Sequence, residues 1–150
     1  VLLSGVEHCN ITGNTFDNIS GNNLVFYPNS QNRGSSFNHI NSNTFLNPVF
    51  KISETADESL IMMGYSGYNY MHNNNIIENN ILDGANFIKL GIGFIGHGDN
   101  NVFRKNKISN CLSYGIVSYE SQVVGNTMKN NQIIDNEIRN IGQIGYKKNS

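Results

Sequence analysis

The sequence of 150 residues has little charge, two cysteines, two prolines and no tryptophan, and these shortages exclude several classes of protein. Its 10 basic and 11 acidic residues are balanced, so composition predicts no electrostatic surface for nucleic acid. Two cysteines are too few for a disulfide framework. No stretch reaches the roughly 18 consecutive apolar residues of a membrane-spanning helix, so no membrane contact is expected.

Asparagine and glycine are abundant instead, with 28 and 15 copies. Both are unfavourable inside helices, so a helical bundle is not expected. Domains usually have about 100–200 residues, and we predict a single domain over residues 1–150. Because the chain begins at Val1 and shows no signal-peptide pattern, we expect it to be a segment of a longer protein.

The asparagines belong to a ten-residue frame that occurs five times. The frame reads asparagine, any residue, apolar, two mostly polar residues, asparagine, any residue, apolar, any residue, and asparagine or glycine. Only Cys9 departs from it at the first position. The copies are residues 9–18, 38–47, 75–84, 101–110 and 131–140, and their central asparagines are separated by 29, 37, 26 and 30 residues.

The frame predicts short strands rather than helices. Its two apolar residues are five positions apart on either side of an asparagine bend, which leaves about three residues for each strand. Asparagine suits these bends because it tolerates the left-handed backbone conformation. Stacked asparagines can also hydrogen-bond to one another along a column.

A third strand is predicted after each frame. These strands are expected at residues 23–27, 48–52, 86–90, 114–118 and 143–146. Three short strands per turn predict an all-β solenoid, a parallel β-helix of about five coils with asparagine ladders. The apolar residues expected to point inward are Ile11, Phe16, Ile40, Phe45, Ile77, Leu82, Phe103, Ile108, Ile133 and Ile138.

This repeat resembles that of the right-handed parallel β-helix proteins of the pectate-lyase-like superfamily, over about residues 6–146. The leucine-dense frame of leucine-rich repeats and the six-residue period of left-handed β-helices are both absent. The resemblance implies work on polysaccharides, because members of the superfamily include polysaccharide lyases, glycoside hydrolases and phage tail spikes. It also implies a location outside the cell or at a virion surface. Tail spikes trimerise side by side, so the resemblance implies a homotrimer, or flanking domains that cap the open ends.

The longest insertion, residues 53–72, carries the candidate site. It contains three carboxylates, three tyrosines and a histidine, and hydrolysis of a glycosidic bond needs two carboxylates about 5–10 Å apart. Tyrosine offers sugars an aromatic face with a polar edge. The insertion could therefore line a saccharide groove, or it could instead fold back on the solenoid and bury its apolar residues. The catalytic candidates here are Glu54, Asp57 and Glu58, and the substrate-binding candidates are Tyr65, Tyr68, Tyr70 and His72.

A second candidate is His97, within Gly96-His97-Gly98. The tripeptide resembles the glycine-histidine-glycine motif of polygalacturonases, in which the histidine supports a group of aspartates. The other motifs of that family are missing from this chain, so a tight turn between strands is the favoured interpretation.

Lyases of the superfamily use a lysine or arginine as the base, often with calcium, so calcium is a possible cofactor only if the protein is a lyase. Under this resemblance the candidate bases are Lys89, predicted to lie in a third strand, and Arg104 and Lys105 beside a bend. Glu78 or Asp83 could provide acidic ligands. Each of these charges could equally be a solvated surface group. No histidines share the spacing of a zinc site, so no metal site is predicted.

Cys9 and Cys111 fall in the first and fourth coils. Three coil spacings separate them by roughly 14 Å, which is too far for a disulfide. Both are predicted to be free thiols.

Two functions stay open at this point. The chain is either part of a polysaccharide-cleaving protein, or a carbohydrate-binding or architectural β-helix without chemistry. The insertion favours the first function, and the lack of a complete catalytic set favours the second.

Overall fold

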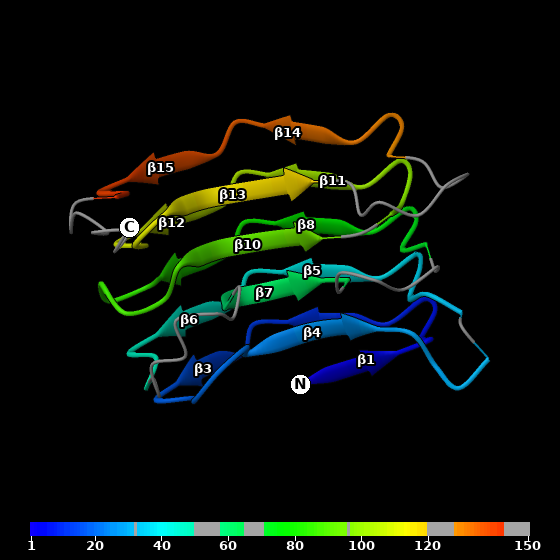
Figure 1. Ribbon diagram of the computed structural model, residues 1–150, viewed down its shortest axis with the longest axis horizontal. Helices are drawn as coiled ribbons and strands as arrows, with labels where there is room; N and C mark the ends of the chain where they lie inside the picture. The colour runs from blue at the N-terminus through cyan, green and yellow to red at the C-terminus, as the bar shows by residue number, and fades with distance from the viewer. Residues whose placement is uncertain (32, 50–57, 65–70, 96, 120–127, 143–150) are drawn as a thin grey trace, which may run out of the picture.

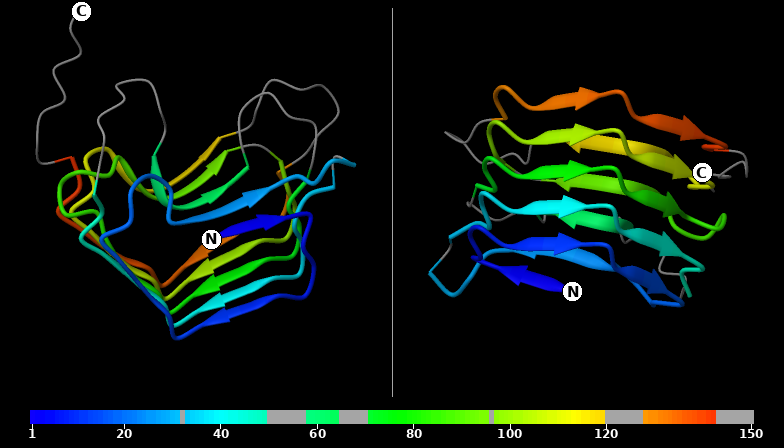
Figure 2. Two further views of the ribbon diagram at one scale, coloured as in Figure 1. Left: turned by 90° about the horizontal axis from the view of Figure 1, so that it is seen from below. Right: turned by 180° about the vertical axis from the view of Figure 1, so that it is seen from behind.

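The computed structural model describes residues 1–31, 33–49, 58–64, 71–95, 97–119 and 128–142. Within these ranges there are fifteen strands and no helix. The strands form three parallel sheets of five strands each, and the chain visits the three sheets in turn (Figure 1). Seen along the stack, the sheets form three sides of a coil that repeats five times (Figure 2). The predicted all-β parallel β-helix of about five coils is confirmed.

Strands of one sheet are one coil apart in the sequence. The first sheet contains β1 (Leu2–Ser4), β4 (Leu24–Tyr27), β7 (Ser59–Met63), β10 (Leu90–Ile95) and β13 (Tyr114–Tyr119). The second contains β2 (Asn10–Thr12), β5 (His39–Asn41), β8 (Ile76–Glu78), β11 (Val102–Arg104) and β14 (Gln132–Ile134). The third contains β3 (Thr15–Asp17), β6 (Thr44–Leu46), β9 (Ile81–Asp83), β12 (Lys107–Ser109) and β15 (Glu137–Arg139).

The core consists of apolar columns that run from coil to coil. In the second sheet the middle residue of every strand pairs with the middle residue of the next, as Ile40 does with Ile77. The third sheet has an equivalent column, in which the rings of Phe16 and Phe45 stack with centroids 4.5 Å apart. All ten residues predicted to point inward occupy these columns.

Burial along the columns depends on the coil. The six inward residues of the three middle coils are at most 1% exposed. Ile133 and Ile138 are 56% and 45% exposed, because among the described strands β14 and β15 have a neighbour on one side only. The direction of these side chains was predicted correctly, but their burial requires a coil on both sides.

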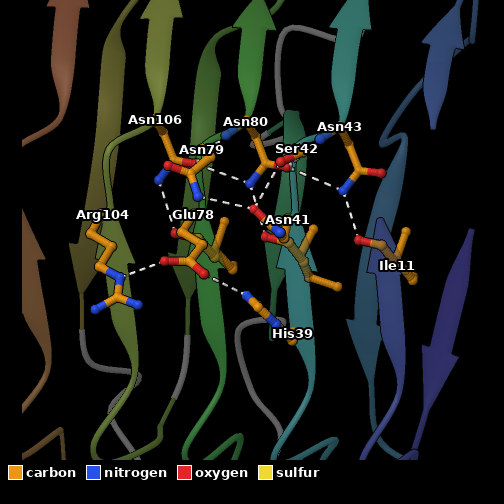
Figure 3. Close-up of polar contacts among 12 residues, drawn as sticks. Ile11, His39, Asn41, Ser42, Asn43, Glu78, Asn79, Asn80, Arg104 and Asn106 are labelled. Carbon is orange, nitrogen blue, oxygen red and sulfur yellow. Dashed lines mark hydrogen bonds and ion pairs between the residues drawn. The ribbon is translucent and has the colours of Figure 1, made fainter. Parts of the chain in front are cut away.

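Asparagine side chains connect the coils between the second and third sheets. The side chain of Asn80 is fully buried. Its Nδ2 donates to Oδ1 of Asn106 and to the carbonyl of Ile40, both at 3.0 Å. Its Oδ1 accepts the backbone N–H and the side-chain amide of Asn43 at 2.9 and 3.1 Å (Figure 3). Each amide therefore satisfies buried polar groups of both neighbouring coils.

A second ladder precedes the strands of the second sheet. Asn38, Asn75, Asn101 and Asn131 repeat the same bonding pattern, with side-chain amide bonds of 3.0–3.1 Å. Cys9 takes the position of the first asparagine, and its backbone N–H still donates to Oδ1 of Asn38 at 2.9 Å. The predicted ladders are thus present, and Cys9 removes only the side-chain part of one rung. Cys9 and Cys111 are both free thiols, as predicted.

The corners of the coils contain residues in the left-handed backbone region. At the bend between the second and third sheets, Gly13 has a φ of 70° and Asn79 a φ of 54°. Ser42, Lys105 and Asp135 occupy the same corner in the other coils, with φ between 53° and 55°. Asparagine and glycine adopt this conformation at low cost, which explains why the repeat is rich in both.

The strands of the first sheet were predicted less well. Most of the strand expected at 48–52 lies outside the described residues, and Val49 forms an isolated bridge. The described strand that this coil contributes to the first sheet is β7, which lies inside the predicted insertion. The strand expected at 86–90 begins instead at Leu90. The residues of β7 are all buried, so it lacks the alternation that identifies a strand in sequence. The strand expected at 143–146 lies outside the described residues.

We predict that replacing Asn80 by alanine destabilises the protein by about 3 kcal/mol or more. The substitution leaves the buried backbone N–H of Asn43 without its acceptor and removes the side-chain bonds to Asn106 and to the carbonyl of Ile40. An orphaned group costs about 1–3 kcal/mol, and each lost hydrogen bond adds about 0.5–1.5 kcal/mol. Urea unfolding of Asn80→Ala measures the effect. Asn14→Ala, at the exposed start of the same ladder, should cost less than about 1 kcal/mol; equal losses would contradict the ladder.

Candidate functional site

The structure describes three of the eight site residues named from the sequence. Glu54, Asp57, Tyr65, Tyr68 and Tyr70 lie outside the described residues, so their roles stay predictions. Glu58, His72 and His97 are described, and they differ in exposure. Glu58 is half-buried, whereas both histidine side chains are fully buried.

Glu58 lies immediately before β7, where the third coil enters the first sheet. Its carbonyl accepts the N–H of Leu90 at 3.0 Å, and the next N–H, of Ser59, donates to Oδ1 of Asn22 at 2.7 Å. The backbone at Glu58 is therefore bound to the coils on both sides. A strand edge held in this way keeps a functional side chain in place better than a free loop does.

The carboxyl group of Glu58 is in an unusual environment. Its Oε2 is inaccessible to solvent and has no hydrogen-bond partner among the described residues. Burial raises the pKa of this carboxyl, and the positive charge of Lys89 opposes that increase. A carboxyl that holds its proton more tightly than usual can act as a general acid.

Lys89 lies beside Glu58 in the next coil, since Ser59 pairs with Leu90. Lys89 was predicted to lie in a third strand, but it immediately precedes β10, because the strand of this coil begins at Leu90. On the far side of β10, Leu90 pairs with Tyr114, whose side chain is 57% exposed. An acid, a cation and an accessible aromatic residue thus lie near the start of three consecutive first-sheet strands, with Tyr114 one position further along than the register of Glu58 and Lys89.

His72 has a structural environment. Its Nδ1 accepts the backbone N–H of Ser35 at 2.9 Å, and its ring lies edge-on to Phe26 with centroids 6.0 Å apart. Burial lowers the pKa of His72 to about 4, although the carbonyl of Ser35, 3.3 Å from Nδ1, acts in the opposite direction. His72 is therefore neutral near pH 7, and its buried ring supports the coil instead of presenting a surface to a sugar.

His97 forms a parallel bridge with Met71, and its carbonyl accepts the N–H of His72 at 2.9 Å. The residue is part of an inter-coil pair, which differs from the tight turn favoured by its glycine neighbours. A Cβ on Gly98 would overlap the carbonyl oxygen of His72, so glycine is required there by close packing. Gly96 lies outside the described residues.

A separate polar cluster lies on the outer face of the second sheet (Figure 3). Glu78 Oε1 is 2.7 Å from Nε2 of His39, and Glu78 Oε2 accepts Nε–H of Arg104 at 2.5 Å. The hydrogen bond from Arg104 is the main reason that the pKa of Glu78 is lowered, and the bond with His39 contributes in the same direction. One carboxylate thus connects three consecutive coils.

Sequence reasoning identified part of this cluster. Glu78 and Arg104 were named as possible lyase residues, and they occupy the same position in successive frames, so they are lateral partners. His39 was missed as a site residue because it reaches Glu78 diagonally from a different frame position. Lys105 lies at the exposed bend that follows Arg104, as expected.

The described strands do not bring two carboxylates together. Glu78 has Asn41 and Arg104 as its ladder partners, and Asp83 pairs with Ser109. Among the described residues there is also no group of three histidine, cysteine or acidic residues that could hold a metal ion. No helix long and apolar enough to cross a membrane occurs in the described part of the chain.

The chain matches the sequence profile of a known protein family. The profile of the family described as "Right handed beta helix region" matches residues 1–149. Neither the curated proteins nor the solved structures include a significant match.

We predict that stability falls as pH decreases from 6.5 to 4, because of His72. The folded protein holds His72 neutral, with a pKa of about 4 instead of 6.5, so the unfolded chain binds a proton first and is favoured as pH falls. The full effect is about 3 kcal/mol. Urea unfolding at several pH values measures it. His72→Gln should flatten this dependence and His8→Gln, at an exposed position, should not; an unchanged slope in His72→Gln would contradict the assignment.

Proposed function

Because the chain belongs to the family of right-handed β-helix regions, we propose that it is a polysaccharide-interacting β-helix and part of a carbohydrate-cleaving protein. The fold provides long flat faces whose outward residues repeat once per coil, about 4.8 Å apart. An extended polymer can contact several coils at once on such a face. Fold alone does not assign an activity, so the proposal depends on the chemistry of the edge beside Glu58.

The observation that carries the proposal is the environment of the Glu58 carboxyl. A general acid must hold a proton near neutral pH and release it to the leaving oxygen, and burial raises the pKa in that direction. Its Oε2 has no hydrogen-bond partner among the described residues, so these residues do not use its capacity to hold a proton or a hydrogen bond. In this proposal Glu58 donates the proton.

The neighbours of Glu58 fit two supporting roles. Lys89, in the adjacent coil, can stabilise negative charge on the substrate or its leaving group. Tyr114 exposes an aromatic ring in the following coil, which suits contact with the apolar face of a sugar. The second carboxylate of a hydrolase would come from Glu54 or Asp57, both outside the described residues. A lyase reaction would use Lys89 as base, with calcium as a possible cofactor.

A non-catalytic function is the alternative. It is supported by the described strands, in which every carboxylate has a partner of another type. In that case the protein binds polysaccharide, or serves as a spacer, without cleaving it. Either function places the protein where extracellular or bacterial surface polymers occur, with a side-by-side trimer or flanking domains as the expected assembly.

A screen of bacterial capsular and plant polysaccharides tests the proposal. New reducing ends without ultraviolet absorbance indicate a hydrolase, and unsaturated products that absorb indicate a lyase. We predict that Glu58→Gln lowers cleavage at least about 100-fold, because the amide has no proton to donate. Binding of the polymer should be retained, since Gln has nearly the same shape.

Glu137→Gln is the matched control, because Glu137 lies on the third sheet in an ion pair with Arg139. It should cleave at the wild-type rate. Full activity in Glu58→Gln would overturn the role of Glu58. Polymer binding without any cleavage would favour the alternative function, and the absence of binding to every polymer would leave only the architectural one.

A further inference from the structure

The outer face of the second sheet concentrates its charge in one place. The first and third residue of each strand point away from the core, which gives ten outward positions. Three of the ten are titratable, and all three belong to the cluster of His39, Glu78 and Arg104. The outward residues are Asn10, Thr12, His39, Asn41, Ile76, Glu78, Val102, Arg104, Gln132 and Ile134.

Arg104 is held in place by one hydrogen bond, and its other donors have no partner among the described residues. Its Nε–H is bonded to Glu78, which fixes the plane of the guanidinium group. Nη1 and Nη2 have no hydrogen-bond partner among the described residues, and the side chain is 44% exposed. The end of the guanidinium group is therefore a preoriented pair of donors, and this geometry matches the two oxygens of a carboxylate.

Two asparagine side chains beside the cluster are also held in place by hydrogen bonds, and each keeps one polar atom without a partner among the described residues. Asn41 Oδ1 accepts Nδ2–H of Asn79 and Oγ–H of Ser42, both at 3.0 Å (Figure 3). Within the described part of the chain, Asn41 Nδ2 and Asn79 Oδ1 have no partner. One donor and one acceptor are thus available for the hydroxyl groups of a sugar.

Apolar surface lies next to these polar groups. Ile76 and Val102 are lateral partners on β8 and β11, and both are half-buried. A sugar ring presents C–H groups on its faces and hydroxyls at its edge, so it needs apolar and polar contacts together. The cluster supplies both on rigid strands of three consecutive coils, which reduces the entropy lost on binding.

The charge around Arg104 is mixed. Glu78 neutralises one positive charge, and the exposed Lys105 and Lys107 follow on the same coil. Lys107 faces Glu137 of the next coil, which also pairs with Arg139, and Asp135 occupies the corner position that Lys105 has one coil earlier. Recognition of a carboxylate would therefore depend on the paired donors of Arg104 and not on a positive surface.

We propose that the outer face of β5, β8 and β11 binds a carboxylate-bearing saccharide unit, with Arg104 as its carboxylate anchor. This inference rests on the proposed interaction with polysaccharide, and it names an acidic polymer and a second surface separate from the edge at Glu58. Glu78 and His39 are positioning residues, because they hold Arg104 rather than contact the ligand. A polymer that runs along the solenoid axis crosses the three coils in order.

The test uses a galacturonate tetramer and its fully methyl-esterified form as a neutral control. Binding is measured by calorimetry, and the contact surface is mapped by NMR chemical-shift changes in the whole chain. We expect the acidic tetramer to shift the signals of Asn41, Asn79 and Arg104. The ester should bind about tenfold more weakly or worse, because a hydrogen bond to a charged group is lost.

Variants distinguish a specific contact between Arg104 and the carboxylate from a general effect of charge and from a loss of stability. Arg104→Gln and Arg104→Lys should both weaken binding about tenfold or more, since Lys keeps the charge but lacks the paired donors. Arg139→Gln, which also removes an arginine bonded to a glutamate, should bind like the wild type. Urea unfolding of each variant shows whether a loss reflects destabilisation.

The possible results distinguish this inference from the proposed function. Chemical-shift changes confined to residues around Glu58, or wild-type affinity in Arg104→Gln, would overturn the binding surface on β5, β8 and β11. Either result leaves the proposed function intact. Shifts on β5, β8 and β11 without cleavage of any polymer support the surface and contradict a cleaving function. Equal affinity for the acid and its ester overturns the carboxylate anchor, and no binding of either ligand overturns the inference.

Discussion

The rest of the structure depends on hydrogen bonds between buried asparagine side chains of successive coils. Strands in the second and third sheets are three residues long, so backbone pairing alone gives little resistance to a shift in register. A shift of one residue would turn the inward column of Ile40, Ile77 and Phe103 towards solvent. The amide of Asn80 prevents this, because it bonds to Asn43 and Asn106 and also to a backbone carbonyl. The buried polar groups of each corner are satisfied only in one register.

This arrangement leaves the outward positions free to differ. The middle residue of each short strand and the ladder asparagines are tied to the core, whereas the first and third residues face outward and vary from coil to coil. Two places carry distinct chemistry. Before the first-sheet strands, burial raises the pKa of Glu58 beside Lys89, and on the second sheet Glu78 bonds to His39 and Arg104. The residues that stabilise the coils are therefore different from those of the two candidate sites, in line with the general separation of fold and site.

The parts of the fold that could be predicted are those encoded within one frame. The spacing of asparagine and apolar residues is local, so the strands around Ile40 and Phe45 and the ladders were correctly predicted. The first sheet was harder, because β7 is buried on both faces and shows no alternation. Contacts between coils are 26 to 37 residues apart in sequence for Asn43, Asn80 and Asn106, so the burial of His72 against Ser35 could not be inferred. Alignment of the frames does place Glu78 beside Arg104, but the diagonal contact with His39 requires the side-chain geometry.

Hydrogen exchange of asparagine side chains tests the central role of the ladders most directly. The side-chain amide protons of Asn43, Asn80 and Asn106 lie within hydrogen bonds in the interior, so NMR should show them exchanging as slowly as the backbone amides of β8 and β11. The side-chain amide of exposed Asn14 provides the internal reference and should exchange much faster. If the amides of Asn43, Asn80 and Asn106 exchange at the rate of Asn14 while the backbone amides are protected, the ladders do not hold the coils together and the account is contradicted.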